Sequence, residues 1–142
     1  MSETARTGVV EREVVVEAPP ELVYRYFTEN RKILLWSAVE VSFDPRPGGK
    51  IRQAITEEWI MVGETLEVDP PHRLVYSWGW EGDPVMPPGS SRVEVTFTAI
   101  PEGTRLRVVH SAIPVEQVPS HERGWDDHLP LLVDAAGGDP EK

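Results

Sequence analysis

The sequence predicts an α+β domain in which one long C-terminal helix lies across a face of an antiparallel sheet. Three observations predict this fold class. Apolar and polar residues alternate in seven segments, which is typical of half-buried strands. Turns rich in proline, glycine and aspartate follow many of these segments. The long segment 115–136 has helical spacing instead, and an amphipathic helix of that length needs a broad surface on which to lie.

The N-terminal part begins with a strand, expected at 10–17, where valines alternate with glutamates and Arg12. Two prolines and Glu21 then mark the start of a short helix that runs to about residue 28. A second short helix is expected at 30–36. Each is too short to be stable by itself, so both must pack on the sheet.

The next six strands are expected at 39–43, 50–55, 58–68, 73–80, 91–99 and 103–110. Gly79, which lies between two tryptophans, indicates a bulge or a close backbone approach. The proline-rich segment 82–89 is a loop, either a flap over a cavity or a long hairpin connection. In the final helix, Pro130 lacks the amide that would bond to the carbonyl of Asp126, which predicts a kink between them.

Composition limits the function classes. With 142 residues the chain is expected to form one domain at 9–137, between a disordered segment 1–8 and a mobile tail 138–142. The net charge of −10 disfavours nucleic acid and anionic membranes as partners. The absence of cysteine excludes disulfides and thiolate chemistry. No apolar stretch could span a bilayer or act as a signal peptide, so a cytoplasmic location is expected.

Several motifs carry a family resemblance. They are EREVVVEAPPELVYRYFT, DPRPGG, GETLEVDPPHRLVYSWGW and GTRLRVVHS, followed by IP, H and GWDDHL. Together they resemble the SRPBCC or START-like superfamily over residues 9–137, and within it the domain named after the activator of heat-shock protein 90 ATPase. Polyketide cyclases and dehydratases and birch pollen allergen-like proteins are related. The resemblance implies the helix-grip fold, with a curved sheet and a C-terminal helix around a cavity for an apolar or amphipathic ligand.

Strand and helix parity identify polar and aromatic side chains that point inward with the apolar ones, provided that no bulge shifts the register. The predicted ligand-binding residues are Arg12, Glu64, Tyr76, Trp78, His110, Trp125 and His128. The alternative interpretation is structural: Arg12 and Glu64 pair with each other or reach solvent at the rim, and the histidines form hydrogen bonds to backbone or water. Trp36, Trp59 and Trp80 are expected to pack or to lie at the rim. Gln53 also faces inward.

The leading hypothesis is a binding domain for a small hydrophobic molecule, with no cofactor and no assigned catalytic residue. The alternative is an enzyme of the cyclase, dehydratase or hydrolase kind, with His110 as base beside Glu64. A third hypothesis, a co-chaperone acting on a heat-shock ATPase, follows from the family name alone. No metal site is predicted, because His121 and His128 lie about 10 Å apart along the helix. A homodimer is left open.

Overall fold

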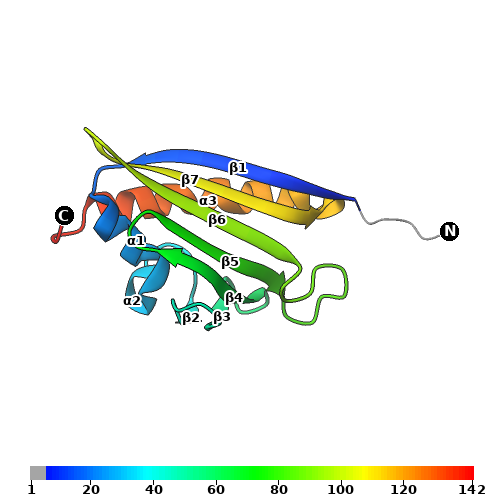
Figure 1. The fold of residues 1–142 in the computed structure, drawn as a ribbon. Helices are drawn as coiled ribbons and strands as arrows, with labels where there is room; N and C mark the ends of the chain where they lie inside the picture. Colours follow the sequence, from blue (N-terminus) through cyan, green and yellow to red (C-terminus); the bar gives the residue numbers. More distant parts are fainter. Residues whose placement is uncertain (1–5) are drawn as a thin grey trace.

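The computed structural model describes residues 6–142 and confirms the predicted fold class. The strands are β1 (Thr7–Val16), β2 (Glu40–Phe43), β3 (Lys50–Ala54), β4 (Ile60–Asp69), β5 (Arg73–Trp80), β6 (Ser91–Ile100) and β7 (Gly103–Pro114). The helices are α1 (Pro20–Thr28), α2 (Asn30–Ile33), the 3-10 turn η1 (Val115–Gln117) and α3 (Val118–Gly137). All strands form one antiparallel sheet in the order β1-β7-β6-β5-β4-β3-β2, and α3 lies along its concave face (Figure 1).

The N-terminal elements differ slightly from the prediction. β1 begins at Thr7, because Thr7 and Gly8 pair with the end of β7, so the predicted disorder at 6–8 is wrong. The rest of that prediction, residues 1–5, lies outside the described residues. α1 starts with proline in its first turn, as predicted. α2 ends at Ile33, three residues before the expected end, and a turn follows it.

α3 buries the side chains that its helical spacing selects: His121, Trp125, Leu129, Leu132 and Ala136. This confirms the face predicted from the sequence, although His128 is only half-buried. The helix continues past Pro130 to Gly137, with the proline on its exposed side. The bend expected at Pro130 stays a prediction.

The C-terminal tail is anchored rather than mobile, contrary to the prediction. Asp139 is only 8% exposed and its carboxylate accepts a hydrogen bond of 2.6 Å from the Tyr26 hydroxyl. Lys32 Nζ lies 3.1 Å from the same carboxylate. The Tyr26 hydrogen bond, first, and the charge of Lys32 lower the pKa of Asp139 to about 2. The tail therefore ties α3 to α1 and α2.

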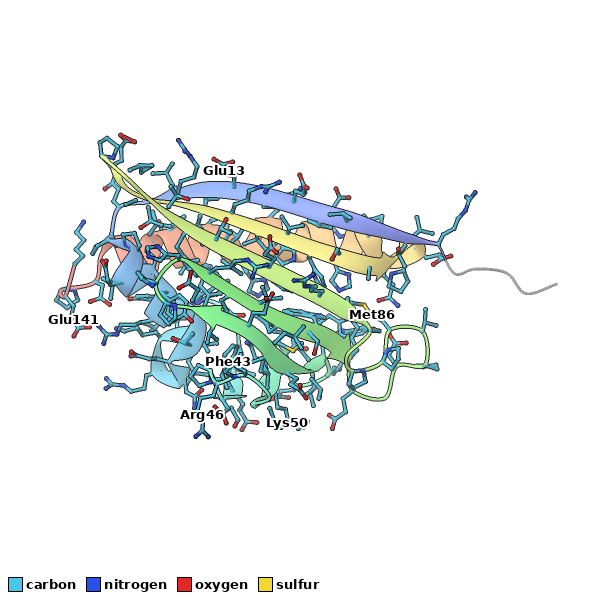
Figure 2. All side chains as sticks on the ribbon, viewed as in Figure 1. Glu13, Phe43, Arg46, Lys50, Met86 and Glu141 are labelled. Atoms are coloured by element: carbon cyan, nitrogen blue, oxygen red, sulfur yellow. The ribbon has the colours of Figure 1, made fainter. Side chains whose placement is uncertain are left out.

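The loop between β5 and β6 folds back on its own strand. Gly79 meets the Pro87 carbonyl so closely that any Cβ would collide, which confirms the predicted backbone approach. The Trp80 amide donates to the Met86 carbonyl at 2.8 Å, and the Met86 side chain is fully buried. Figure 2 shows Met86 where this loop meets the sheet. These contacts favour a fixed hairpin connection over a flap.

Candidate functional site

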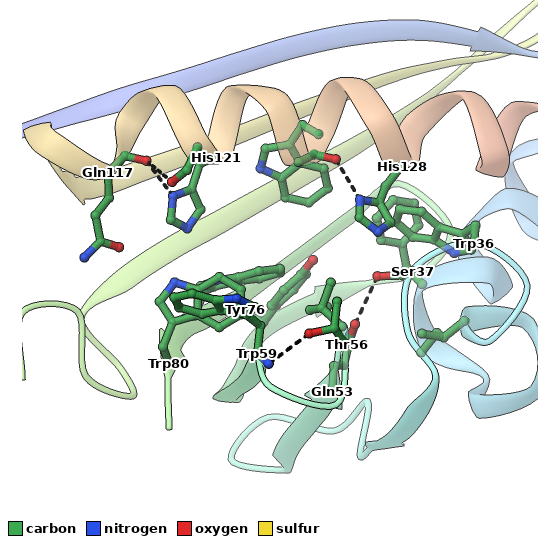
Figure 3. A pocket seen from close by; sticks show the side chains of 17 residues that line it. Trp36, Ser37, Gln53, Thr56, Trp59, Tyr76, Trp80, Gln117, His121 and His128 are labelled. Carbon is green, nitrogen blue, oxygen red and sulfur yellow. Dashed lines mark hydrogen bonds between the residues drawn. The ribbon is translucent and has the colours of Figure 1, made fainter. Parts of the chain in front are cut away.

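A cavity of about 260 Å³ lies between the N-terminal half of α3 and the inner face of the sheet (Figure 3). All five tryptophans of the chain line it, together with Phe27 and Tyr76. No Asp, Glu, Lys or Arg stands among its lining residues in the part of the chain that the structure describes. Since an apolar cavity of about 150 Å³ already holds benzene, this one has room for about two rings.

The aromatic wall follows from strand geometry. Alternate residues of a strand point to the same face, so Tyr76, Trp78 and Trp80 of β5 all face α3. Trp59 stands just before β4, and its ring packs edge-on against Trp80 with centroids 5.4 Å apart. At 54% exposure, Trp59 forms the open mouth of the cavity. Burial raises the pKa of the Tyr76 hydroxyl, which therefore stays protonated.

The tryptophans predicted to bind a ligand and those predicted to pack lie around the same cavity. Trp78 and Trp125 line the cavity as the parity argument places them, with ring centroids 5.9 Å apart. Trp36 and Trp80 pack with the core and Trp59 lies at the rim, as predicted, and all three also line the same cavity. The curvature of the sheet brings β3, β4 and β5 around one space, and sequence parity does not report curvature.

His110 is a fully buried link between α3 and the sheet. The Trp125 indole, which can only donate, donates to His110 Nδ1 at 3.2 Å. The proton of the neutral imidazole is therefore on Nε2, which donates to Ser91 Oγ at 2.9 Å. Ser91 Oγ in turn donates to the Trp78 carbonyl at 2.7 Å. The chain of hydrogen bonds joins α3 to β7, β6 and β5.

This arrangement removes His110 from acid–base chemistry. Both ring nitrogens are engaged, and the side chain does not line the cavity. Burial, with a smaller contribution from His121, lowers the pKa of His110 to about 3. A general base needs a free lone pair within reach of its substrate, and His110 offers none. His110 was predicted to contact a ligand, but it is not among the residues that line the cavity.

The prediction that Glu64 faces the interior is wrong. β4 carries an irregularity between Thr65 and Glu67, so the residues before and after it alternate with opposite parity. Met61, Gly63 and Thr65 point inward, and the Glu64 carboxylate pairs with Lys50 at 3.0 Å on the outer face. Lys50, at the start of β3, lies on the side of the molecule remote from α3 (Figure 2). No acid–base pair with His110 can form there.

Arg12 also lies outside the cavity. It stands on the inner face of β1, as predicted, but its guanidinium reaches Asp126 on the exposed side of α3, with Nε 2.6 Å from Oδ1. Hydrogen bonding to Asp126, first, and the neighbouring Glu122 raise the pKa of Arg12. Arg12 therefore fastens the sheet edge to α3 through Asp126, and not through the pairing with Glu64 that the structural alternative offered.

The polar part of the lining comes mainly from α3. His128 and His121 each donate from Nδ1 to a carbonyl one turn earlier, at Gly124 and Gln117, both at 2.8 Å (Figure 3). Opposite them, Ser37 donates to the Gln53 amide oxygen at 3.1 Å. His128 and the inward position of Gln53 were predicted. His121 was not a predicted ligand-binding residue, although its position one turn before Trp125 signals it.

Within residues 6–142, no group of three or more His, Asp or Glu side chains is placed to hold a metal ion. None of the helices in these residues combines the length and apolar character that crossing a bilayer requires.

The geometry defines a class: a curved antiparallel sheet closed by a C-terminal helix over an aromatic cavity is the helix-grip arrangement of the SRPBCC superfamily. The family model described as "Activator of Hsp90 ATPase homolog 1-like protein" matches residues 17–137. The chain belongs to this family. A comparison with curated proteins finds no significant match.

Three solved structures illustrate the relationship. An AHSA1-like protein from Rhizobium etli is 41% identical, with 96% of this chain and 88% of that chain covered and a TM-score of 0.76. DynU16, a protein in the dynemicin biosynthetic locus, is 26% identical, with 89% and 46% covered and a TM-score of 0.77. The Aha1 dimer from Colwellia psychrerythraea has a TM-score of 0.80 at 15% identity, covering 93% and 99%, which shows the shared fold.

Proposed function

We propose that this protein binds a small hydrophobic or amphipathic molecule in the cavity beneath α3. The observation that carries the proposal is an aromatic cavity of about 260 Å³ that has no charged residue among the described residues lining it. Pockets of this kind, apolar with a few placed polar groups, are the usual form of small-molecule sites. Burial of apolar ligand surface supplies roughly 25 cal/mol per Å² before the costs of association.

Relatives support a small-molecule role. DynU16 is placed in a biosynthetic locus by its description, and its aligned part shares the fold of this chain. The acid–base pair predicted for the enzyme alternative is not formed, because His110 and Glu64 lie on opposite faces of the sheet. The family name refers to activation of Hsp90, and the cavity gives that activity no additional support.

Gly124 offers a test that separates binding from folding. It lies on the cavity side of α3, and a Cβ built there meets nothing within 4 Å. Gly124→Leu should therefore fill the cavity without a clash, and replacing a helical glycine also favours the helix by up to about 1 kcal/mol. The control is Arg123→Leu, which puts the same side chain on the exposed side of the same turn.

The measurement is the melting temperature with and without 2-naphthol, an uncharged two-ring compound. We expect 2-naphthol to raise the melting temperature of the wild type and of Arg123→Leu. Gly124→Leu should melt at or above the wild-type temperature without the compound and show no rise with it. An equal rise in all three proteins would place binding elsewhere and overturn the proposal.

A further inference from the structure

Two residues that line the cavity each bury a polar side-chain atom without a hydrogen-bond partner. These atoms are Nε1 of Trp78 and Nε2 of His121, whose residues are 8% and 7% exposed. In the described part of the chain they are the two buried side-chain nitrogen or oxygen atoms in this condition. Buried polar groups in folded proteins are nearly always paired, and each unpaired one costs about 1–3 kcal/mol. Their position indicates that a bound molecule supplies the partner.

The two atoms have opposite requirements. The Trp78 indole N–H can only donate. His121 donates from Nδ1 to the Gln117 carbonyl, so Nε2 of the neutral ring carries a lone pair and can only accept. Burial lowers the pKa of His121, which keeps this ring neutral. The two rings are neighbours in the cavity wall, with centroids 6.5 Å apart and an edge-to-face arrangement.

The surroundings supply no other partner and no charge. The neighbouring Trp125 indole is occupied by His110, whose own two nitrogens are engaged. His110 stands 5.2 Å from His121, centroid to centroid, and is neutral as well. No lining residue of the described chain carries a formal charge that could balance an ion. Burying an unpaired ionised group is far more costly than burying a neutral one.

Building on the proposed function, we infer that the ligand is an uncharged molecule bearing a hydroxyl group that bridges Trp78 and His121. The hydroxyl oxygen accepts the hydrogen bond from Trp78 Nε1, and its O–H donates to His121 Nε2. A hydroxyl is the smallest group that satisfies a donor and an acceptor together. The aromatic rings around it hold the apolar body of the same molecule.

The test compares three compounds with the same two-ring body: naphthalene, 2-naphthol and 2-naphthoate. Dissociation constants are measured by calorimetry at neutral pH for the wild type, for His121→Phe and for His72→Phe. His72 is an exposed residue of the turn between β4 and β5, which makes it a matched control. Two added hydrogen bonds predict that 2-naphthol binds the wild type at least about tenfold more tightly than naphthalene.

The inference is supported if the preference for 2-naphthol falls toward one in His121→Phe and persists in His72→Phe. Equal binding of naphthalene and 2-naphthol to the wild type, or tighter binding of 2-naphthoate, overturns the inference and leaves the proposed function intact. Absence of binding by both uncharged compounds overturns the proposed function itself. If His121→Phe does not fold, Trp78→Phe removes the donor and should abolish the same preference.

Discussion

The two halves of α3 lie on the same sheet but have different surroundings. In the C-terminal half, Leu129, Leu132 and Ala136 are buried in a continuous core, and Asp139 just beyond the helix is bonded to α1. In the N-terminal half, His121 and Trp125 border the cavity instead, and so does His128 at the middle of the helix. The difference teaches that one half of the helix packs directly into the core, whereas the other is held to the sheet by Trp125 and Asp126 while it borders a cavity.

The largest loss of stability is expected in the C-terminal half of α3, which is packed into the core. Leu132→Ala removes a fully buried side chain from a packed core and should lower the free energy of unfolding by about 2–5 kcal/mol, measured by urea denaturation. Leu131→Ala, at an exposed position on the same helix, should change it by less than about 0.5 kcal/mol. A cost below about 1 kcal/mol for Leu132→Ala would mean that this half is not tightly packed.

A smaller loss of stability is expected where the N-terminal half of α3, which borders the cavity, is fastened to the sheet. Trp125→Phe removes the indole N–H and leaves His110 Nδ1 buried without a donor, which should cost about 1–3 kcal/mol. Trp59→Phe is the control, because Trp59 also lines the cavity but is largely exposed at its mouth. Equal stabilities of the two variants would contradict the role of His110 as a link.

The anchored tail gives a pH-dependent effect that sharpens the comparison. The folded pKa of Asp139, about 2, lies below the usual value of about 3.9, so its stabilisation is present above pH 4 and lost as the pH falls toward 2. Asp139→Asn should therefore flatten the dependence of the urea midpoint on pH in this window. Tyr26→Phe should flatten it in part, since the Tyr26 hydrogen bond is the main cause. An unchanged slope in both variants would contradict the anchoring.

The smallest effect is expected at Glu64. Its pair with Lys50 lies on the outer face, and exposed ion pairs contribute about 0–1 kcal/mol. Glu64→Gln should therefore leave the unfolding free energy nearly unchanged and the affinity for 2-naphthol at the wild-type value. A clear loss of affinity would place Glu64 in the cavity after all and contradict the observed register of β4.

The sequence predicted the sheet, its final strand and the buried face of α3, because uninterrupted alternation and helical spacing determine which side chains share a face. It placed Glu64 wrongly, since one irregularity at Leu66 reverses the parity along β4. The sequence predicts a mobile tail, because the partners of Asp139 are more than a hundred residues away and a local pattern does not reveal them. The cavity itself depends on sheet curvature, which local patterns do not encode.

The gathering of every tryptophan around one cavity has a practical consequence. The tryptophan fluorescence of this protein originates entirely from the walls of its candidate site, with no indole elsewhere to add background. A compound that enters the cavity should therefore change the tryptophan emission. Binding of unlabelled compounds to the native protein can then be screened by tryptophan fluorescence.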